Sequence, residues 1–151
     1  MRTLLASLVF FVAMPSSGCS LGGLEFDPAF EPHAARLSGA EMLRLAQWRS
    51  DLRIRFPNMG EFYVEVQASN AAGVSVRLAE SRRIHLMESL QNLGIARADI
   101  QVSKVVERSV DPADLARADL HLKVIRYINT AAIAIDPKCP HACCPGPQPI
   151  R

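Results

Sequence analysis

The side chains best suited to chemistry gather near the C-terminus, where one short stretch contains Cys139, His141, Cys143 and Cys144. Thiolates and imidazoles bind soft and borderline metal ions. Zinc sites, however, usually draw two short ligand pairs from well-separated segments, whereas these groups form one cluster interrupted by Pro140. We therefore expect no bound metal and no other cofactor.

In an oxidising compartment the same cysteines predict a disulfide, formed by Cys139 with either Cys143 or Cys144. A bond between the adjacent Cys143 and Cys144 would strain the backbone between them. Either pairing leaves one thiol over, which could join a second chain. Because the surrounding prolines disfavour helix and central strand, we expect residues 129–151 to form a proline- and cysteine-rich tail.

The N-terminal segment predicts export. Arg2 supplies a short positive start, an apolar run extends from Leu4 to Met14, and small residues precede Cys19. The run is shorter than the roughly 20 apolar residues that cross a bilayer. These features are typical of a signal peptide, here over residues 1–18.

The Ser-Gly-Cys sequence that ends this segment resembles the lipobox of bacterial lipoproteins. The resemblance implies that Cys19 becomes the first mature residue and carries the lipid, whose acyl chains hold the protein on a membrane leaflet. We expect a protein anchored at the periplasmic face of the outer membrane. If the lipobox is not used, ordinary cleavage nearby would release a periplasmic protein.

The rest of the chain offers no recognisable catalytic motif. It has no Gly-rich phosphate loop, nucleophile elbow or HExxH pattern. His33, His85 and His121 lie far apart, without an acid or nucleophile at a recognisable spacing. With 17 Lys and Arg against 15 Asp and Glu, the net charge of +2 gives no electrostatic footprint for nucleic acid. We expect neither an enzyme nor a nucleic-acid-binding protein.

The length of 151 residues, 49% of them hydrophobic, fits one domain, and the spacing of apolar residues predicts its first elements. Residues 19–36 predict a linker with a short strand at 24–26. Ser38 and Glu41 form a capping box that starts a helix at residue 39, and Pro57 to Gly60 end it. Period-two alternation predicts a strand over 61–68, and a second helix extends from about residue 75 to 93, before Gly94.

The C-terminal part predicts two more strands. One begins at Ile100, and residues 109–118 indicate a loop with one helical turn at 112–115. Leu120, Leu122 and Val124 alternate with more polar positions and predict a last strand that ends near residue 128. The fold class is therefore α/β (α+β), a two-layer sandwich in which two helices cover one face of a mixed sheet of three to four strands.

The order of elements and the local motifs of residues 24–128 resemble the OmpA-like family, the peptidoglycan-binding module of bacterial outer-membrane proteins and lipoproteins. The stretches that carry this resemblance are Leu24-Glu-Phe-Asp-Pro-Ala-Phe30 for the opening strand, Leu78-Ala-Glu-Ser-Arg82 and Leu90-Gln-Asn-Leu-Gly-Ile95 for the start and end of a helix, and Ala118-Asp-Leu-His-Leu-Lys-Val124 for the final strand. The resemblance places the OmpA-like domain at residues 37–128.

The resemblance also implies a site for the diaminopimelate of the cell-wall peptide, whose carboxylate and ammonium groups this family binds with an arginine and an aspartate. Arg82 takes the arginine position and Asn70 the aspartate position. A guanidinium matches a carboxylate with two parallel hydrogen bonds, whereas Asn70 keeps the shape of an aspartate without its charge. From the residues alone, Arg82 is also compatible with a solvated helix arginine paired with Glu80 or another acid.

These features favour a non-enzymatic protein of the cell envelope. The first hypothesis is an outer-membrane-anchored OmpA-like module that binds the peptide stem of peptidoglycan, or descends from such a binder. The alternative is a structural or assembly lipoprotein of a pilus or secretion apparatus, of the CpaD kind, whose partners are envelope proteins. A periplasmic copper or zinc chaperone built on the tail is a distant third.

Overall fold

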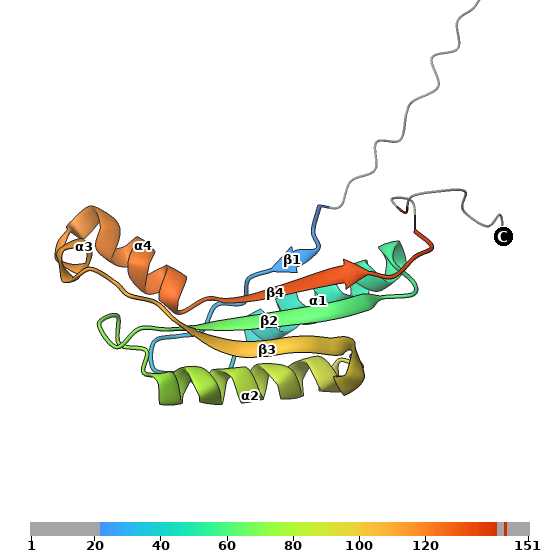
Figure 1. The fold of residues 1–151 in the computed structure, drawn as a ribbon, viewed down its shortest axis with the longest axis horizontal. Helices are drawn as coiled ribbons and strands as arrows, with labels where there is room; N and C mark the ends of the chain where they lie inside the picture. Colours follow the sequence, from blue (N-terminus) through green and yellow to red (C-terminus); the bar gives the residue numbers. More distant parts are fainter. Residues whose placement is uncertain (1–21, 142–143, 145–151) are drawn as a thin grey trace, which may run out of the picture.

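A computed structural model describes residues 22–141 and residue 144. Two main helices and a four-stranded sheet form its body (Figure 1). Two shorter helices follow the third strand along the chain and precede the fourth. The elements in chain order are β1 (Glu25–Phe26), α1 (Gly39–Arg55), β2 (Gly60–Ala68), α2 (Val76–Asn92), a 3-10 turn η1 (Arg97–Asp99), β3 (Ile100–Glu107), α3 (Pro112–Ala116), α4 (Ala118–Ile128) and β4 (Ala131–Pro137).

The strands lie in the order β1-β4-β2-β3, so the last strand of the chain occupies the interior of the sheet. β2 pairs with β3 in parallel and with β4 in antiparallel orientation, and β4 also pairs antiparallel with β1. Val64 lies opposite Ile133 of β4 and Ser103 of β3. The mixed sheet of four strands confirms the predicted class.

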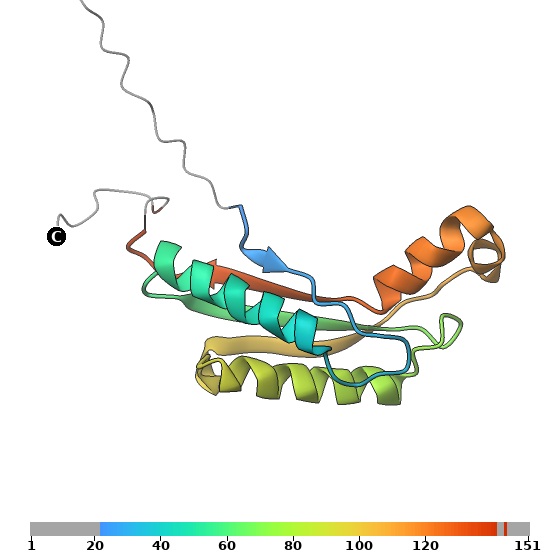
Figure 2. The same ribbon diagram turned by 180° about the vertical axis from the view of Figure 1, so that it is seen from behind.

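Both long helices cover the same face of the sheet. The ring of Trp48 on α1 meets Phe62 of β2 edge to face, with centroids 6.4 Å apart. On α2, Arg83 donates to the Ser103 hydroxyl of β3, on the same face. Figure 2 shows α1 in front of the sheet and α2 alongside β3. The core lies between these layers, whereas the opposite face carries polar pairs such as Glu65 with Lys104.

Local signals explain where the helices begin and end. Ser38 accepts a hydrogen bond from the Glu41 amide at 3.3 Å, as the capping box predicts. The Glu41 carboxylate accepts from the Ala29 amide, so it ties the linker to α1. Ser75 caps α2 in the same way, and Gly94, with a φ of 83°, follows its end. No helix among the residues described here is both long and apolar enough to span a membrane.

The predicted strand over residues 120–128 is wrong, because this stretch forms the helix α4. Leu120, Val124 and Ile128 are spaced four apart and lie on one helical face, so the same residues satisfy a helical period as well as an alternating one. The true last strand is β4, inside the segment predicted to be tail from residue 129. Its Ala131, Ile133 and Ile135 are buried against the helices, so the folded part extends to residue 137.

Candidate ligand site around Arg82

Arg82 lies on the buried face of α2. Leu78, Arg82, Leu86 and Leu90 recur every four residues, so their side chains share one face of the helix. Leu86 and Leu90 belong to the core, and Arg82 between them is itself fully buried. A charged side chain is almost never buried to this degree unless it is paired.

The partners of the Arg82 guanidinium are all uncharged. Nε donates to the carbonyl oxygen of Ala34 at 2.8 Å, and Nη2 donates to the carbonyl of Glu31 at 3.1 Å and to Asn129 Oδ1 at 2.8 Å. The guanidinium carbon lies 4.8 Å from the centroid of the Phe30 ring, within cation–π distance. Nη1 is buried and has no hydrogen-bond partner among the described residues.

No carboxylate of the described residues forms a salt bridge with Arg82. Burial alone lowers the pKa of Arg82 to about 10, which keeps the guanidinium charged at neutral pH. A buried charge without a counter-ion costs several kcal/mol of desolvation, of which hydrogen bonds to neutral acceptors recover only part. The site therefore has an unused donor and an unbalanced positive charge.

Three segments meet at this guanidinium: the linker around residues 28–34, helix α2, and the junction between α4 and β4. Asn129 fixes the junction, because its amide Nδ2 donates to the Ile125 carbonyl and its own carbonyl accepts from the Phe30 amide at 2.7 Å. The linker crosses the site with Glu31, Pro32 and His33 exposed to solvent. The linker thus separates Arg82 from solvent on this side.

The next residue, Arg83, is the partly exposed arginine paired with Glu80 that the sequence analysis considered for Arg82. It forms a two-pronged ion pair with Glu80, one turn earlier on α2, and also donates to Ser103. This hydrogen bond lowers the pKa of Glu80 and raises that of Arg83. The interpretation of Arg82 as a solvated arginine paired with Glu80 is therefore wrong, and it applies to Arg83.

Asn70 lies elsewhere, in the exposed turn between β2 and α2. Ser69 and Val74 close this turn with two backbone hydrogen bonds, and Gly73 adopts a φ of 79° within it. Asn70 lines a surface cavity of about 430 Å³ together with Glu107 and Arg108, and Arg82 is not among the residues of that cavity. The structure therefore does not bring Asn70 and Arg82 into one open pocket.

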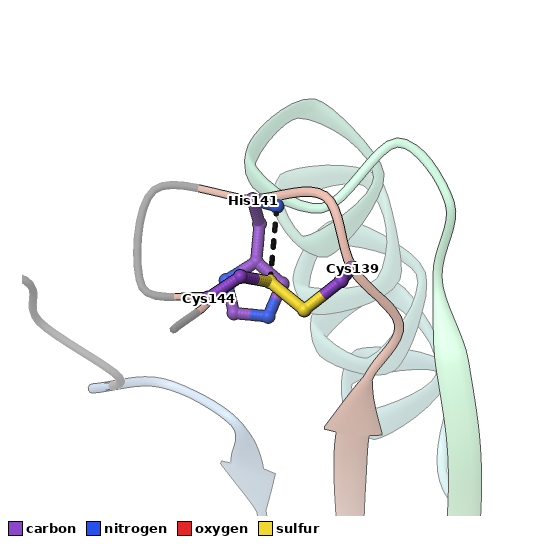
Figure 3. Close-up of a disulfide and its surroundings, with 3 residues drawn as sticks. All are labelled: Cys139, His141 and Cys144. Atoms are coloured by element: carbon purple, nitrogen blue, oxygen red, sulfur yellow. Dashed lines mark hydrogen bonds between the residues drawn. A yellow bond between two sulfur atoms is a disulfide. The ribbon is translucent and has the colours of Figure 1, made fainter. Parts of the chain in front are cut away.

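The cysteines of the C-terminal stretch are joined in one of the two predicted ways. Cys139 forms a disulfide with Cys144, with Cα atoms 5.9 Å apart, and His141 lies beside the bond (Figure 3). Neither cysteine among the described residues is a free thiol. Cys143 and the predicted lipidation residue Cys19 lie outside the described residues.

Sequence reasoning missed two groups that build the Arg82 site, Asn129 and Phe30. The position of Arg82 in the middle of a leucine stripe was a usable signal, because it places a charge where the helix must be buried. Asn129 carried no such signal, since it fell in the segment predicted to be tail.

Solved structures share this fold. The chain is similar to the OmpA-like domain of FopA1 from Francisella tularensis subsp. tularensis SCHU S4, with a TM-score of 0.53 and 17% identity over 75% of this chain and 72% of that one. It is also similar to a MotB-like protein from Desulfovibrio vulgaris, with a TM-score of 0.51 and 13% identity over 78% and 75% of the two chains. No family model and no curated protein matches the sequence. At these identities the likeness shows the fold alone, and that fold is the OmpA-like one that the motifs predicted.

Proposed function

We propose that the protein is a non-enzymatic OmpA-type module of the cell envelope that binds the peptide stem of peptidoglycan, with the Arg82 guanidinium as its carboxylate receptor. One observation carries the proposal. Arg82 is a fully buried cation without a carboxylate partner among the described residues, and its Nη1 has no hydrogen-bond acceptor there. A ligand carboxylate would supply both the missing charge and the missing acceptor.

Binding requires the linker to move. The carbonyls of Glu31 and Ala34 occupy two of the guanidinium donors, and both belong to the segment that crosses the site at the surface. A carboxylate that displaces them accepts the same guanidinium hydrogen bonds and also brings the negative charge that the backbone carbonyls lack. Asn129, which lies outside the linker, would continue to position the guanidinium.

Asn70 stays in the proposal as a hydrogen-bonding contact for the ammonium end of the same ligand. Asn70 lines a surface cavity that does not include Arg82, so one ligand would have to span two separate regions to contact both residues. Because Asn70 carries no charge, this contact contributes less than the aspartate that the family resemblance leads us to expect.

Sedimentation with insoluble peptidoglycan tests the proposal. We expect the wild-type chain to pellet with the cell wall and Arg82→Lys to bind about tenfold more weakly, because lysine lacks the planar fork. Arg83→Lys is the matched control and should pellet like wild type, and Asn70→Asp should bind more tightly. Circular dichroism of each variant confirms that it is folded. A wild-type chain that stays in the supernatant overturns the function, and full binding by folded Arg82→Lys overturns the site.

The location follows from the N-terminal prediction. We propose that Cys19 carries a lipid that anchors the protein to the periplasmic face of the outer membrane, next to its wall ligand. Incorporation of labelled fatty acid by wild type, and its loss in Cys19→Ser, would support the anchor. A Cys19→Ser protein that still carries the label would contradict it.

A second function, an assembly module of a pilus or secretion apparatus without wall binding, is favoured by a different observation. Helix α4 extends beyond the sheet (Figure 1), and Leu122 and Tyr127 on it are 74% and 52% exposed. A projecting helix with exposed apolar side chains is accessible to a partner protein. Crosslinking from Leu122 to an envelope protein, with no sedimentation on cell wall, would select this function over the first.

A further inference from the structure

The stretch that follows β4 brings three potential metal ligands together. The Sγ atoms of Cys139 and Cys144 and a ring nitrogen of His141 all lie within 4.8 Å of one another. Figure 3 shows the imidazole beside the sulfur atoms, on the same short loop. Two sulfurs and one imidazole nitrogen form a donor set that soft metal ions prefer.

The body of the protein holds this loop in place. Lys138 donates its amide to the Met59 carbonyl at 2.7 Å, which fixes the start of the loop beside the end of α1. The His141 ring packs edge to face on Phe56, with centroids 5.2 Å apart, and Phe56 is itself buried. The imidazole is therefore positioned by a core residue as well as by the disulfide.

Within the loop, backbone groups already point at sulfur. The His141 amide donates to Cys144 Sγ at 3.3 Å, and the Cys144 amide donates to the His141 carbonyl at 3.0 Å. An N–H group directed at sulfur stabilises a thiolate over a thiol.

We propose that the reduced form of this loop binds one Cu(I) ion through the thiolates of Cys139 and Cys144 and the imidazole of His141. A dithiol reductant first gives two electrons and two protons to the Cys139–Cys144 bond and is itself oxidised to a disulfide. The two new thiols then lose their protons as the metal binds. The oxidised loop offers no thiolate and binds no metal, so the disulfide state controls binding.

The ligand number favours copper over zinc. Structural zinc almost always takes four protein ligands in tetrahedral geometry, whereas the described residues place three at this point. Cu(I) accepts three ligands and prefers thiolates. The expectation that ligand pairs come from separate segments concerns zinc and does not apply to Cu(I).

The site is separate from the one at Arg82. Asn129, which contacts Arg82, precedes β4, and Cys139 follows the other end of the same strand. Loss of copper binding would therefore leave the peptidoglycan proposal standing, and the reverse also holds.

Anaerobic titration with Cu(I) against a colorimetric Cu(I) chelator tests the inference. The full chain is used with Cys19→Ser, which removes the N-terminal thiol. We expect one equivalent bound by the reduced protein and none by the oxidised protein, with sulfur and nitrogen scatterers in X-ray absorption. Cys139→Ser and His141→Gln should each bind at least about tenfold more weakly, since even outer-shell changes at metal sites cost this much.

His85→Gln is the matched control, because His85 lies on α2 and pairs with Glu88 far from the loop in sequence, and it should bind like the parent chain. Equal binding by the oxidised and reduced proteins would overturn the inference. Unchanged binding by Cys139→Ser or His141→Gln, or a loss of binding in Cys143→Ser, would overturn the assigned ligand set.

Discussion

Arg82 and Arg83 are neighbours on α2, and their surroundings differ in charge balance as well as in burial. Arg83 is partly exposed and forms an ion pair with Glu80 across one helical turn. Arg82 is fully buried, and its partners are two backbone carbonyls, one side-chain amide and one aromatic ring. The pKa of Arg83 is raised by its partner, whereas the pKa of Arg82 is lowered by burial.

The difference separates a structural charge from a candidate binding charge. At Arg83 the nearby carboxylate balances the charge, so nothing further is needed from a ligand. At Arg82 the fold carries a desolvation cost that no acid among the described residues offsets. Residues that destabilise the fold are concentrated at functional sites. For this reason the proposed wall contact lies at Arg82.

Truncating the two arginines should give the largest contrast in stability. Arg82→Ala leaves a cavity, two carbonyls and the Asn129 amide oxygen without their donor, so we expect a loss of about 3 kcal/mol in the free energy of unfolding. Arg83→Ala removes a partly exposed pair and should cost about 0.5 kcal/mol. Urea denaturation of both variants measures the contrast.

Arg82→Met distinguishes the charge from the side-chain volume in the same experiment. Methionine keeps much of the bulk against Phe30 and removes the buried charge, so it should cost about half as much as alanine. A methionine variant as unstable as the alanine variant would show that the lost hydrogen-bond donors, and not the lost volume, account for the cost, and would contradict this expectation.

The side chains that accept hydrogen bonds from the two arginines should also differ in how much they stabilise the fold. Asn129→Ala removes a hydrogen bond to a buried charge and a second one to the Ile125 carbonyl, so we expect a loss of about 2 kcal/mol. Ser103→Ala, the matched change at Arg83, should cost less than about 0.5 kcal/mol, because the Glu80 pair remains. Thermal unfolding followed by circular dichroism reports both, and equal losses would remove the distinction between the two sites.

The sequence predicted most of the body of this fold but not its C-terminal part, where a helix and the strand β4 replace the predicted strand and tail. The cap at Ser38, the turn residue Gly94 and the alternation in β2 each fitted only one regular structure, and those elements lie where they were expected. Residues 120–128 satisfied two periods at once. Local pattern could not choose between them, because the choice depends on β4 already filling the interior position of the sheet.

The candidate site was predictable in part, for a related reason. The resemblance selected Arg82 as the important arginine, but whether its charge is balanced depends on Glu31, Ala34 and Asn129, which lie about fifty residues away on either side. Two of these contacts are made by backbone carbonyls. Because every residue type carries a carbonyl, no pattern of side chains predicts these contacts. The sequence likewise left two partners open for Cys139, and the structure pairs it with Cys144.

The smallest expected effect is in how the stability contributed by each arginine depends on pH. Hydrogen bonding to Arg83 lowers the pKa of Glu80 below its ordinary 4.5, so this pair contributes stability above about pH 4.5 and loses it as the pH falls through the lowered value. Because the Glu80 side chain is 44% exposed, we expect the contribution to be below about 0.5 kcal/mol. The stability difference between wild type and Glu80→Gln should therefore shrink between pH 7 and pH 3. The difference between wild type and Arg82→Met should stay constant over the same range, since no carboxylate among the described residues pairs with Arg82. An Arg82→Met difference that also changes in acid would reveal an acidic partner for Arg82, and the charge at that site would then be balanced within the chain.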